Sequence, residues 1–204
     1  MTTELYLASE QAVHTPQVEA LNDKLFGLDR HTKTVARFRD GVDPVASLCL
    51  VALNRADQRV KGSIRYWPIK VGSTELIMLG PVCVDTGWQG KGIAGALIST
   101  SLEIAALHGH SGVILKCNHE DKFAVYAKHG FSCEAASGLV LPGPKKKSRA
   151  ESKLLMALDL VPGTLSDLSG VITKAETLRA PPVMTALYSG LHTEYQAYPV
   201  LQTA

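Results

Sequence analysis

The glycine-rich segment 89–92, Gln-Gly-Lys-Gly, contains the residue types that point most directly to chemistry. It stands between an apolar run that ends near Val84 and a long stretch with helical periodicity. Glycines let the backbone approach a ligand closely, and the first turn of a helix presents free N–H donors. Lys91 adds a positive charge beside them. The segment therefore predicts a cradle for an anion such as a phosphate.

Three phosphate-binding motifs compete for this loop, and a plain glycine-rich turn is the alternative to all of them. The P-loop pattern fails because no Ser or Thr follows Lys91. The dinucleotide pattern G-x-G-x-x-G matches residues 90–95. However, several predicted strands precede it and no second βαβ unit is visible, so an NAD-dependent oxidoreductase stays only an alternative. The pattern Q/R-x-x-G-x-G/A fits residues 89–94 in letters and in position.

The elements expected around the loop describe a mixed α/β domain with an antiparallel front half and one βαβ unit. Strands are predicted at residues 5–7, 47–53, 60–67, 75–84, 113–115, 138–141 and 154–158. Helices are predicted at residues 16–25 with Thr15 as the N-cap, 33–39, 92–107 and 122–129. Because Pro81 cannot donate to a ladder, it marks an edge, a bulge or a departure of its strand from a neighbour. The last two strands are expected to pair with each other.

Composition limits the classes of protein and partner. Of the 204 residues, 46% are hydrophobic and 20% are charged, as in an ordinary folded domain. The net charge of +2 and the isoelectric point near 8.3 are too mild for a dedicated nucleic-acid binder. No apolar run approaches the roughly 20 residues of a membrane span, and the N-terminus lacks signal-peptide features. We therefore expect a cytoplasmic protein without nucleic-acid or membrane partners.

The four cysteines, at positions 49, 83, 117 and 133, form no C-x-x-C pair, so no zinc or other metal is expected. The first three lie in apolar runs, which predicts buried, reduced thiols. A catalytic thiol is the alternative.

The loop motif and the order of elements around it resemble the GNAT superfamily of acyl-CoA-dependent N-acyltransferases over about residues 4–160. Within it, the chain is most similar to the YhbS-like group of predicted acetyltransferases. Four stretches carry this likeness in order, at residues 26–34, 62–68, 79–85 and 126–131. The resemblance implies an α/β GNAT fold, with a mixed central sheet, splayed parallel strands and flanking helices. It implies a domain at residues 4–162, and it leaves 163–204 as a C-terminal extension of unknown role.

The resemblance also implies acetyl-CoA as cosubstrate, with direct attack of a primary amine on its thioester. A non-catalytic acyl-CoA-binding sensor on the same fold is the alternative. The cofactor-binding residues it implies are Val82, Cys83, Val84, Gln89, Gly90, Lys91, Gly92, Ile93, Ala94 and Asn118.

Tyr126 occupies the general-acid position of the family, four residues before Gly130. Its alternative role is that of an amphipathic core residue. An alkyl amine with a pKa near 10.4 is only about one part in two thousand neutral at pH 7, so a base or a water chain must remove a proton. Glu75 is the tentative base, and the other candidates are Asp85, His119 and Glu120. Residues 116–121 depart from the family pattern.

The expected acceptor is a small molecule with an amine or a protein amine. The basic run at residues 145–149 is either a solvated loop between the last two strands or an attractor for an acidic substrate or the CoA 3′-phosphate. Tyr188, Tyr195 and Tyr198 in the tail leave three options open. They dock on the domain, form a homodimer contact or are disordered.

Overall fold

The computed structural model describes residues 4–117, 120–176 and 198–199. The strands are β1 (Leu5–Ser9), β2 (Leu50–Asn54), β3 (Val60–Val71), β4 (Thr74–Val84), β5 (Gly112–Lys116), β6 (Leu139–Val140), β7 (Leu155–Asp159), β8 (Gly170–Lys174) and β9 (Tyr198–Pro199). The helices are α1 (Thr15–Phe26), α2 (Ile93–Leu107), α3 (Phe123–Ala127) and α4 (Lys145–Ser152). Short 3₁₀ turns lie at Leu28–Thr32, Thr34–Phe38, Ala46–Leu48, Thr86–Trp88 and Glu120–Lys122.

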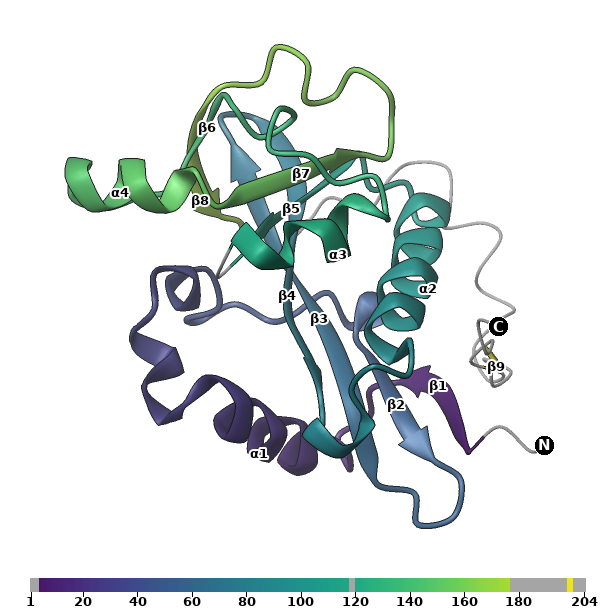
Figure 1. Cartoon of the computed structure of the whole chain (residues 1–204). Helices are drawn as coiled ribbons and strands as arrows, with labels where there is room; N and C mark the ends of the chain where they lie inside the picture. The colour runs from purple at the N-terminus through teal and green to yellow at the C-terminus, as the bar shows by residue number, and fades with distance from the viewer. Residues whose placement is uncertain (1–3, 118–119, 177–197, 200–204) are drawn as a thin grey trace.

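These elements form a mixed sheet with helices on both faces, as the sequence predicts (Figure 1). The strand order is β7-β5-β4-β3-β2-β1-β9, and β8 pairs with the far end of β3. Neighbouring strands are antiparallel along this order except β4 and β5, which are parallel. A parallel pair needs a crossover, and α2 supplies it between β4 and β5.

The parallel pair β4 and β5 separates halfway along β4. Their pairing ends at Leu79 opposite Leu115, while β4 continues to Val84 against β3. At the point of separation, Gly80–Pro81 on β4 stands opposite the single residue Arg65 on β3, which is a β-bulge. The prediction that Pro81 marks a bulge or a departure from a neighbour is confirmed. Beyond the bulge, β4 has no strand partner on its β5 side in the described part of the chain.

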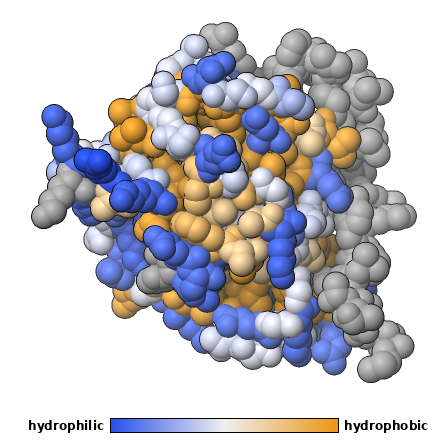
Figure 2. All heavy atoms as spheres, turned by 45° about the horizontal axis from the view of Figure 1, so that its top comes forward, coloured by the Kyte–Doolittle hydropathy of each residue, from blue (hydrophilic) through white to orange (hydrophobic). Residues whose placement is uncertain are grey.

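The region after α3 differs from the prediction. The expected pairing of strands 138–141 and 154–158 is wrong, because β6 pairs with β8 and β7 pairs with β5. The basic run expected in a loop begins helix α4 instead. Ser152 Oγ accepts from the amide of Leu141 and donates to the carbonyl of Ser148, which ties α4 to the chain before it. The hydrophilic side chains of α4 stand out at the left of Figure 2.

Residues 163–176, part of the expected extension, pack against the domain. β8 extends the sheet along β3, and Ile172 is fully buried while Val171 is exposed. The run from Gly170 to Lys174 has the alternation and β-branching of a strand, but the sequence prediction missed it. The domain boundary near residue 162 stays a prediction, and Tyr188 and Tyr195 lie outside the described residues.

Two local predictions need correction. The apolar run from Ser47 is only partly strand, because the turn Ala46–Leu48 precedes β2. Leu48 belongs to that turn, and its side chain is fully buried, which explains why an apolar residue stands there. Thr15 is not the N-cap of α1, since His14 occupies that position and the Thr15 hydroxyl donates to Glu10.

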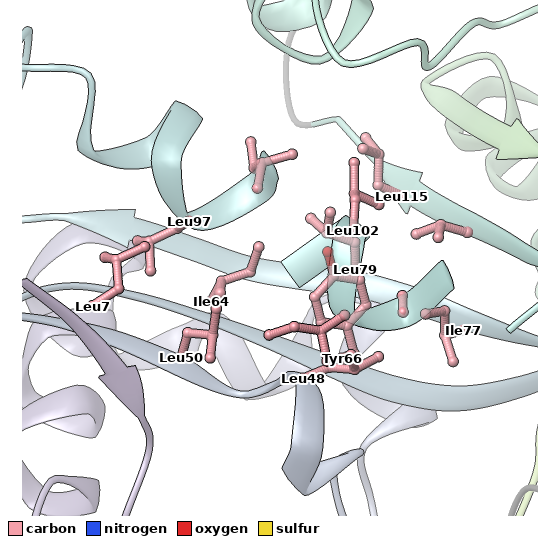
Figure 3. Close-up of a cluster of buried hydrophobic side chains, with 14 of the residues drawn as sticks. Leu7, Leu48, Leu50, Ile64, Tyr66, Ile77, Leu79, Leu97, Leu102 and Leu115 are labelled. Carbon is pink, nitrogen blue, oxygen red and sulfur yellow. The ribbon is translucent and has the colours of Figure 1, made fainter. Parts of the chain in front are cut away.

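The main core lies between the sheet and α2. Side chains from β1 to β5 point toward Leu97 and Leu102 of α2 in Figure 3, and Tyr66 and Ile64 lie among them fully buried. The Tyr66 hydroxyl bonds to Ser101 on α2 at 2.8 Å, so its buried oxygen is satisfied. α1 covers the opposite face of β2 and β4 through a smaller cluster around Val18. Helices on both faces thus fix the position of β4.

Gly62 on β3 permits the close approach of α2 to the sheet. A Cβ at this position would lie 3.1 Å from the carbonyl oxygen of Cys83 and 3.1 Å from Ile93 Cγ2. We expect Gly62→Ala to lower the free energy of unfolding by about 1–3 kcal/mol through overpacking. Urea unfolding measures this change. Gly87→Ala is the control, because a Cβ there meets nothing within 4 Å, and an equal stability of the two variants would contradict the prediction.

Candidate active site

A cleft of about 380 Å³ opens where β4 and β5 separate. β4 contributes residues 78–84 to its wall, and residues 115–117 at the end of β5 face them. α3 contributes Val125 and Tyr126. The lining side chains from other elements are Leu25, Phe26, Arg30, Lys33, Val35, Arg39, Gln89 and Lys122. Of all these lining residues, five are Lys or Arg and none is Asp or Glu, so the cleft favours an anionic ligand.

The structure brings five of the predicted site residues to this cleft. Val82, Cys83, Val84, Gln89 and Tyr126 line it. Gly90, Lys91, Gly92, Ile93 and Ala94 continue from Gln89 into the first turn of α2. Asn118 and His119 lie outside the described residues.

The glycine loop holds a conformation that other residues rarely adopt. Gly90 and Gly92 have φ values of 75° and 77°, and Gly92 is the N-cap of α2. The Gln89 side chain donates to the carbonyl of Val84 at 3.0 Å, which ties the loop to the end of β4. Ile93 is buried and anchors the helix start in the core. The amide groups of the first turn therefore face the exposed loop as free donors.

Two lysine ammonium groups near the loop contact the ring of Trp88. Lys91 Nζ lies 4.3 Å and Lys61 Nζ 5.8 Å from the centroid of the Trp88 ring. Both contacts are within the range of a cation–π interaction. This arrangement places two ammonium groups beside the loop, one more than the sequence predicts.

Tyr126 is held in the cleft wall by apolar contacts. Its ring packs edge-on against Phe131, with the centroids 6.2 Å apart. Burial, with a smaller effect of Cys117, raises the pKa of the Tyr126 hydroxyl to about 12. The phenol therefore keeps its proton throughout the physiological pH range, which suits a hydrogen-bond donor.

The cysteines behave as buried thiols. Cys49, Cys83 and Cys117 are buried, as predicted, whereas Cys133 is exposed. Burial raises the pKa of Cys83, whose Sγ lies 3.0 Å from Ser63 Oγ. A nucleophilic thiol needs a lowered pKa, so this environment argues against a catalytic role for Cys83.

The three candidate bases that the structure describes are not brought to the cleft. Glu75 lies near the start of β4 and Asp85 follows its end, and neither lines the cleft. The ammonium of Lys24, 2.8 Å from Asp85, lowers the pKa of that carboxyl, which makes it a weaker base. Glu120 is exposed in a 3₁₀ turn. Sequence reasoning had no way to exclude these residues, because strand periodicity does not show which end of a strand faces a ligand.

A second cavity of about 520 Å³ adjoins the cleft at Pro81, which lines both. A network of ion pairs forms part of its wall. Arg65 pairs with Glu10 and Glu19, and Arg30 pairs with Glu19 and Asp23. Arg30 and Arg65 lie in the stretches 26–34 and 62–68, but nothing in the sequence singles them out as ion-pair partners.

The network makes stability depend on pH. Burial opposes ionisation of Glu19, but hydrogen bonds from Arg65 and Arg30 outweigh it and lower its pKa below the ordinary value near 4.5. A carboxyl with a lowered folded pKa stabilises the fold above its unfolded pKa, and this contribution is lost as pH falls through the folded value.

We therefore expect the melting temperature of the wild-type protein to fall more steeply than that of Glu19→Gln between about pH 6 and about pH 3. Thermal unfolding by circular dichroism measures it. Glu103→Gln, at an exposed position on α2, is the control and should follow the wild type. Parallel curves for wild type and Glu19→Gln would contradict the expectation.

Within the described ranges, no three His, Cys, Asp or Glu side chains are placed to hold a metal ion. None of the helices that the structure describes is long and apolar enough to cross a membrane. The expectation of a reaction without metal stays a prediction.

Comparisons with known proteins agree with this geometry. The family model "Acetyltransferase (GNAT) domain" matches residues 46–133, which include the cleft walls β4 and β5, the loop and α3. The uncharacterized N-acetyltransferase YhbS of Escherichia coli is 28% identical over 141 residues, which are 68% of this chain and 80% of the relative.

Two solved structures share the fold. The crystal structure of YhbS from Escherichia coli with CoA has a TM-score of 0.69 at 23% identity and matches 89% of this chain and 98% of that one. A GNAT family acetyltransferase from Brucella melitensis, crystallised with acetyl-CoA, has a TM-score of 0.58 at 20% identity. The match covers 85% of this chain and 97% of that one. The predicted fold is confirmed, and the chain is similar to the GNAT acetyltransferase domain over residues 46–133 and to YhbS over 141 residues, as the sequence predicts.

Proposed function

We propose that this protein transfers an acetyl group from acetyl-CoA to a primary amine by direct attack on the thioester. The observation that carries the proposal is the cleft itself. It joins Gln89 at the start of the glycine loop, the Tyr126 side chain and the stretch of β4 that has no strand partner on its β5 side among the described residues. The CoA and acetyl-CoA complexes of the two similar structures support this choice of ligand.

The residues present fit acetyl-CoA along the length of the cleft. The amides of Gly90 to Ala94 would hold the pyrophosphate, because a helix N-terminus favours an anion. The backbone of Val82 to Val84 lacks a strand partner on its β5 side and would bond the amides of the pantetheine arm. Asn118 remains a proposed contact. The thioester would then lie near the bulge at Gly80–Pro81, where β4 and β5 separate.

The reaction forms a C–N bond and breaks the C–S bond. The neutral amine attacks the thioester carbon, and backbone N–H groups of β4 near the bulge stabilise the oxyanion. The thiolate then leaves, and the Tyr126 hydroxyl donates a hydrogen bond to the sulfur as its charge develops. The excess proton of the amine passes to a base.

That base is a water molecule or a side chain of the second cavity. Glu75 does not reach either cavity, and Glu19 is held ionised by two arginines. His31 is exposed and lines the second cavity. If water alone serves, kcat/KM rises about tenfold per pH unit below the pKa of the amine, near 10.4. A loss of kcat/KM of at least about a hundredfold in His31→Gln, with unchanged acetyl-CoA binding, would identify His31 as the base.

A sensor that binds acyl-CoA without turnover is the second candidate. The observation that favours it is the absence of any Asp or Glu among the lining residues of the cleft, all of which belong to the described part of the chain.

Calorimetric titration with acetyl-CoA, with CoA and NAD as comparisons, tests both candidates. A screen of amines for release of free CoA thiol then separates them. Binding with turnover supports the transferase, and binding without turnover of any amine supports the sensor. Absence of acetyl-CoA binding would overturn both, and preference for NAD would favour an oxidoreductase.

A further inference from the structure

Arg39 lies at the junction of the cleft and the second cavity and lines both. A Cβ at Gly80 would lie 3.8 Å from its Nη2, so the guanidinium stands beside the bulge where β4 and β5 separate. The Arg39 Cζ lies 5.7 Å from the centroid of the Trp67 ring. Trp67 is itself fixed, because its Nε1 donates to the carbonyl of Gly80 at 2.8 Å. The position of the charge is thereby set relative to the reacting centre of the proposed function.

Arg39 takes part in none of the ion pairs between described residues. Its Nε is buried without a hydrogen-bond partner, although the carboxylates of Glu19 and Asp40 line the same cavity. Glu19, which also lines the second cavity, is engaged by Arg30 and Arg65. These two arginines are thus paired, whereas Arg39 is not.

The guanidinium of Arg39, which forms no ion pair among the described residues, lowers the free energy of unfolding. Burial, reinforced by the charges of Arg30 and Arg65 and opposed by the charge of Glu19, lowers the pKa of Arg39 to about 10, so the group stays charged at neutral pH. The side chain is partly buried, and a partly buried cation outside an ion pair is unfavourable for the folded state. A residue of this kind is better explained by a ligand than by the needs of the fold.

We propose that the acceptor amine carries an anionic group, a carboxylate or a phosphate, which pairs with Arg39 from the second cavity. This inference rests on the proposed function. Because Arg39 stands beside the bulge, the anionic group must lie only a few bonds from the attacking nitrogen, as in an amino acid or an aminoalkyl phosphate. Lys33 and Arg37 also line the cavity, and its five lysine and arginine side chains outnumber its two carboxylates, Glu19 and Asp40, so the cavity favours an anion.

Matched pairs of acceptors test this proposal. Each pair consists of an amine with an anionic group and its neutral counterpart, such as glycine and glycinamide, β-alanine and its amide, or phosphoethanolamine and ethanolamine. We expect the wild-type protein to prefer the anionic member by at least about tenfold in kcat/KM, as for a charge-assisted pair with an arginine. The pair that shows the preference distinguishes a carboxylate from a phosphate.

Arg39→Gln should abolish this preference, and Arg39→Lys should restore part of it, since a lysine keeps the charge but not the planar fork. Arg59→Gln, at an exposed position that lines neither cavity, is the matched control and should keep the preference. Equal losses for both members of each pair would assign Arg39 to the transferred acetyl group and overturn the proposal. A wild-type preference for neutral amines would also overturn it.

A titration that needs no turnover separates this inference from the proposed function. Malonate is added to protein saturated with CoA, so that the glycine loop is already filled, and its binding is followed by calorimetry. Binding by the wild type and not by Arg39→Gln supports the anion site even if no amine is acetylated. Equal binding by the two proteins, or none by either, overturns it. The melting temperature of Arg39→Gln should equal or exceed that of the wild type, which shows that the variant is folded.

Discussion

Gly92→Val should weaken acetyl-CoA binding at least about tenfold while the protein remains folded. Gly92 has a φ of 77°, and a residue with a side chain pays about 1–2 kcal/mol for such a conformation. The loop would relax away from the conformation that presents the amides of α2. A loss of 1.4 kcal/mol corresponds to about tenfold in affinity. Gly90→Val, with φ at 75°, should act in the same direction, and calorimetry measures both dissociation constants.

Gly90 and Gly92 stand in open space, so a side chain at either position causes no steric clash. A Cβ at Gly90 or Gly92 meets nothing within 4 Å, so the effect comes from the backbone and not from packing in the core. Gly87→Ala in the same loop is the control, because Gly87 has no positive φ and its surroundings are equally open. A folded Gly92→Val protein that binds acetyl-CoA as tightly as the wild type would remove the loop from the proposed site.

Tyr126→Phe should lower kcat about a hundredfold and leave the affinity for acetyl-CoA within about twofold of the wild type. Only the hydroxyl is removed. The ring keeps its edge-on contact with Phe131, and the hydroxyl makes no hydrogen bond within the described residues, so no partner is left unsatisfied. Steady-state kinetics, together with calorimetric binding of acetyl-CoA, separate the two effects.

Tyr6→Phe is the control for Tyr126→Phe. Tyr6 lies on β1, lines neither cavity and bonds through its hydroxyl to Gln58. It should keep the wild-type kcat. An unchanged kcat in Tyr126→Phe would assign Tyr126 to the core, and a parallel loss of affinity and kcat would assign it to binding alone.

The two predictions address different parts of one cleft. The glycine variants test whether the loop binds the phosphates, and Tyr126→Phe tests whether the bound thioester reacts. If the glycine variants lose acetyl-CoA binding while the wild type acetylates no amine, the results support the non-catalytic acyl-CoA sensor. Loss of binding in the first set and loss of turnover in the second would support the transferase.

The sequence by itself determined the local elements around the glycine loop. Residues 89–94 carry their own conformational requirement, because glycine is favoured at the positive φ values of Gly90 and Gly92, and helical periodicity follows directly. Pro81 likewise predicted that β4 separates from a neighbouring strand, because proline has no backbone N–H to donate to a strand partner. The burial of Cys49, Cys83 and Cys117 followed from their apolar runs.

Pairings between distant segments were decided only by the tertiary structure. β6 joins β8 and not β7, and nothing in the two residues of β6 selects one partner over another. Strand pairing depends on which edges remain free after the rest of the sheet has formed. β8 occupies the end of β3 that β2 leaves open, and β7 occupies the free edge of β5.

Which charged side chains line the cleft was also decided only by the tertiary structure. Glu75, Asp85 and Glu120 look equally suitable as bases in the sequence, yet none lines the cleft. Arg39 carries no local signal, and only the fold brings it beside Gly80, forty-one positions away. The physical reason is that conformational preferences act over a few residues, whereas burial and electrostatic pairing depend on every group that the fold brings near. The sequence therefore determined the conformation of the glycine loop, and the tertiary structure decided which charges line the two cavities.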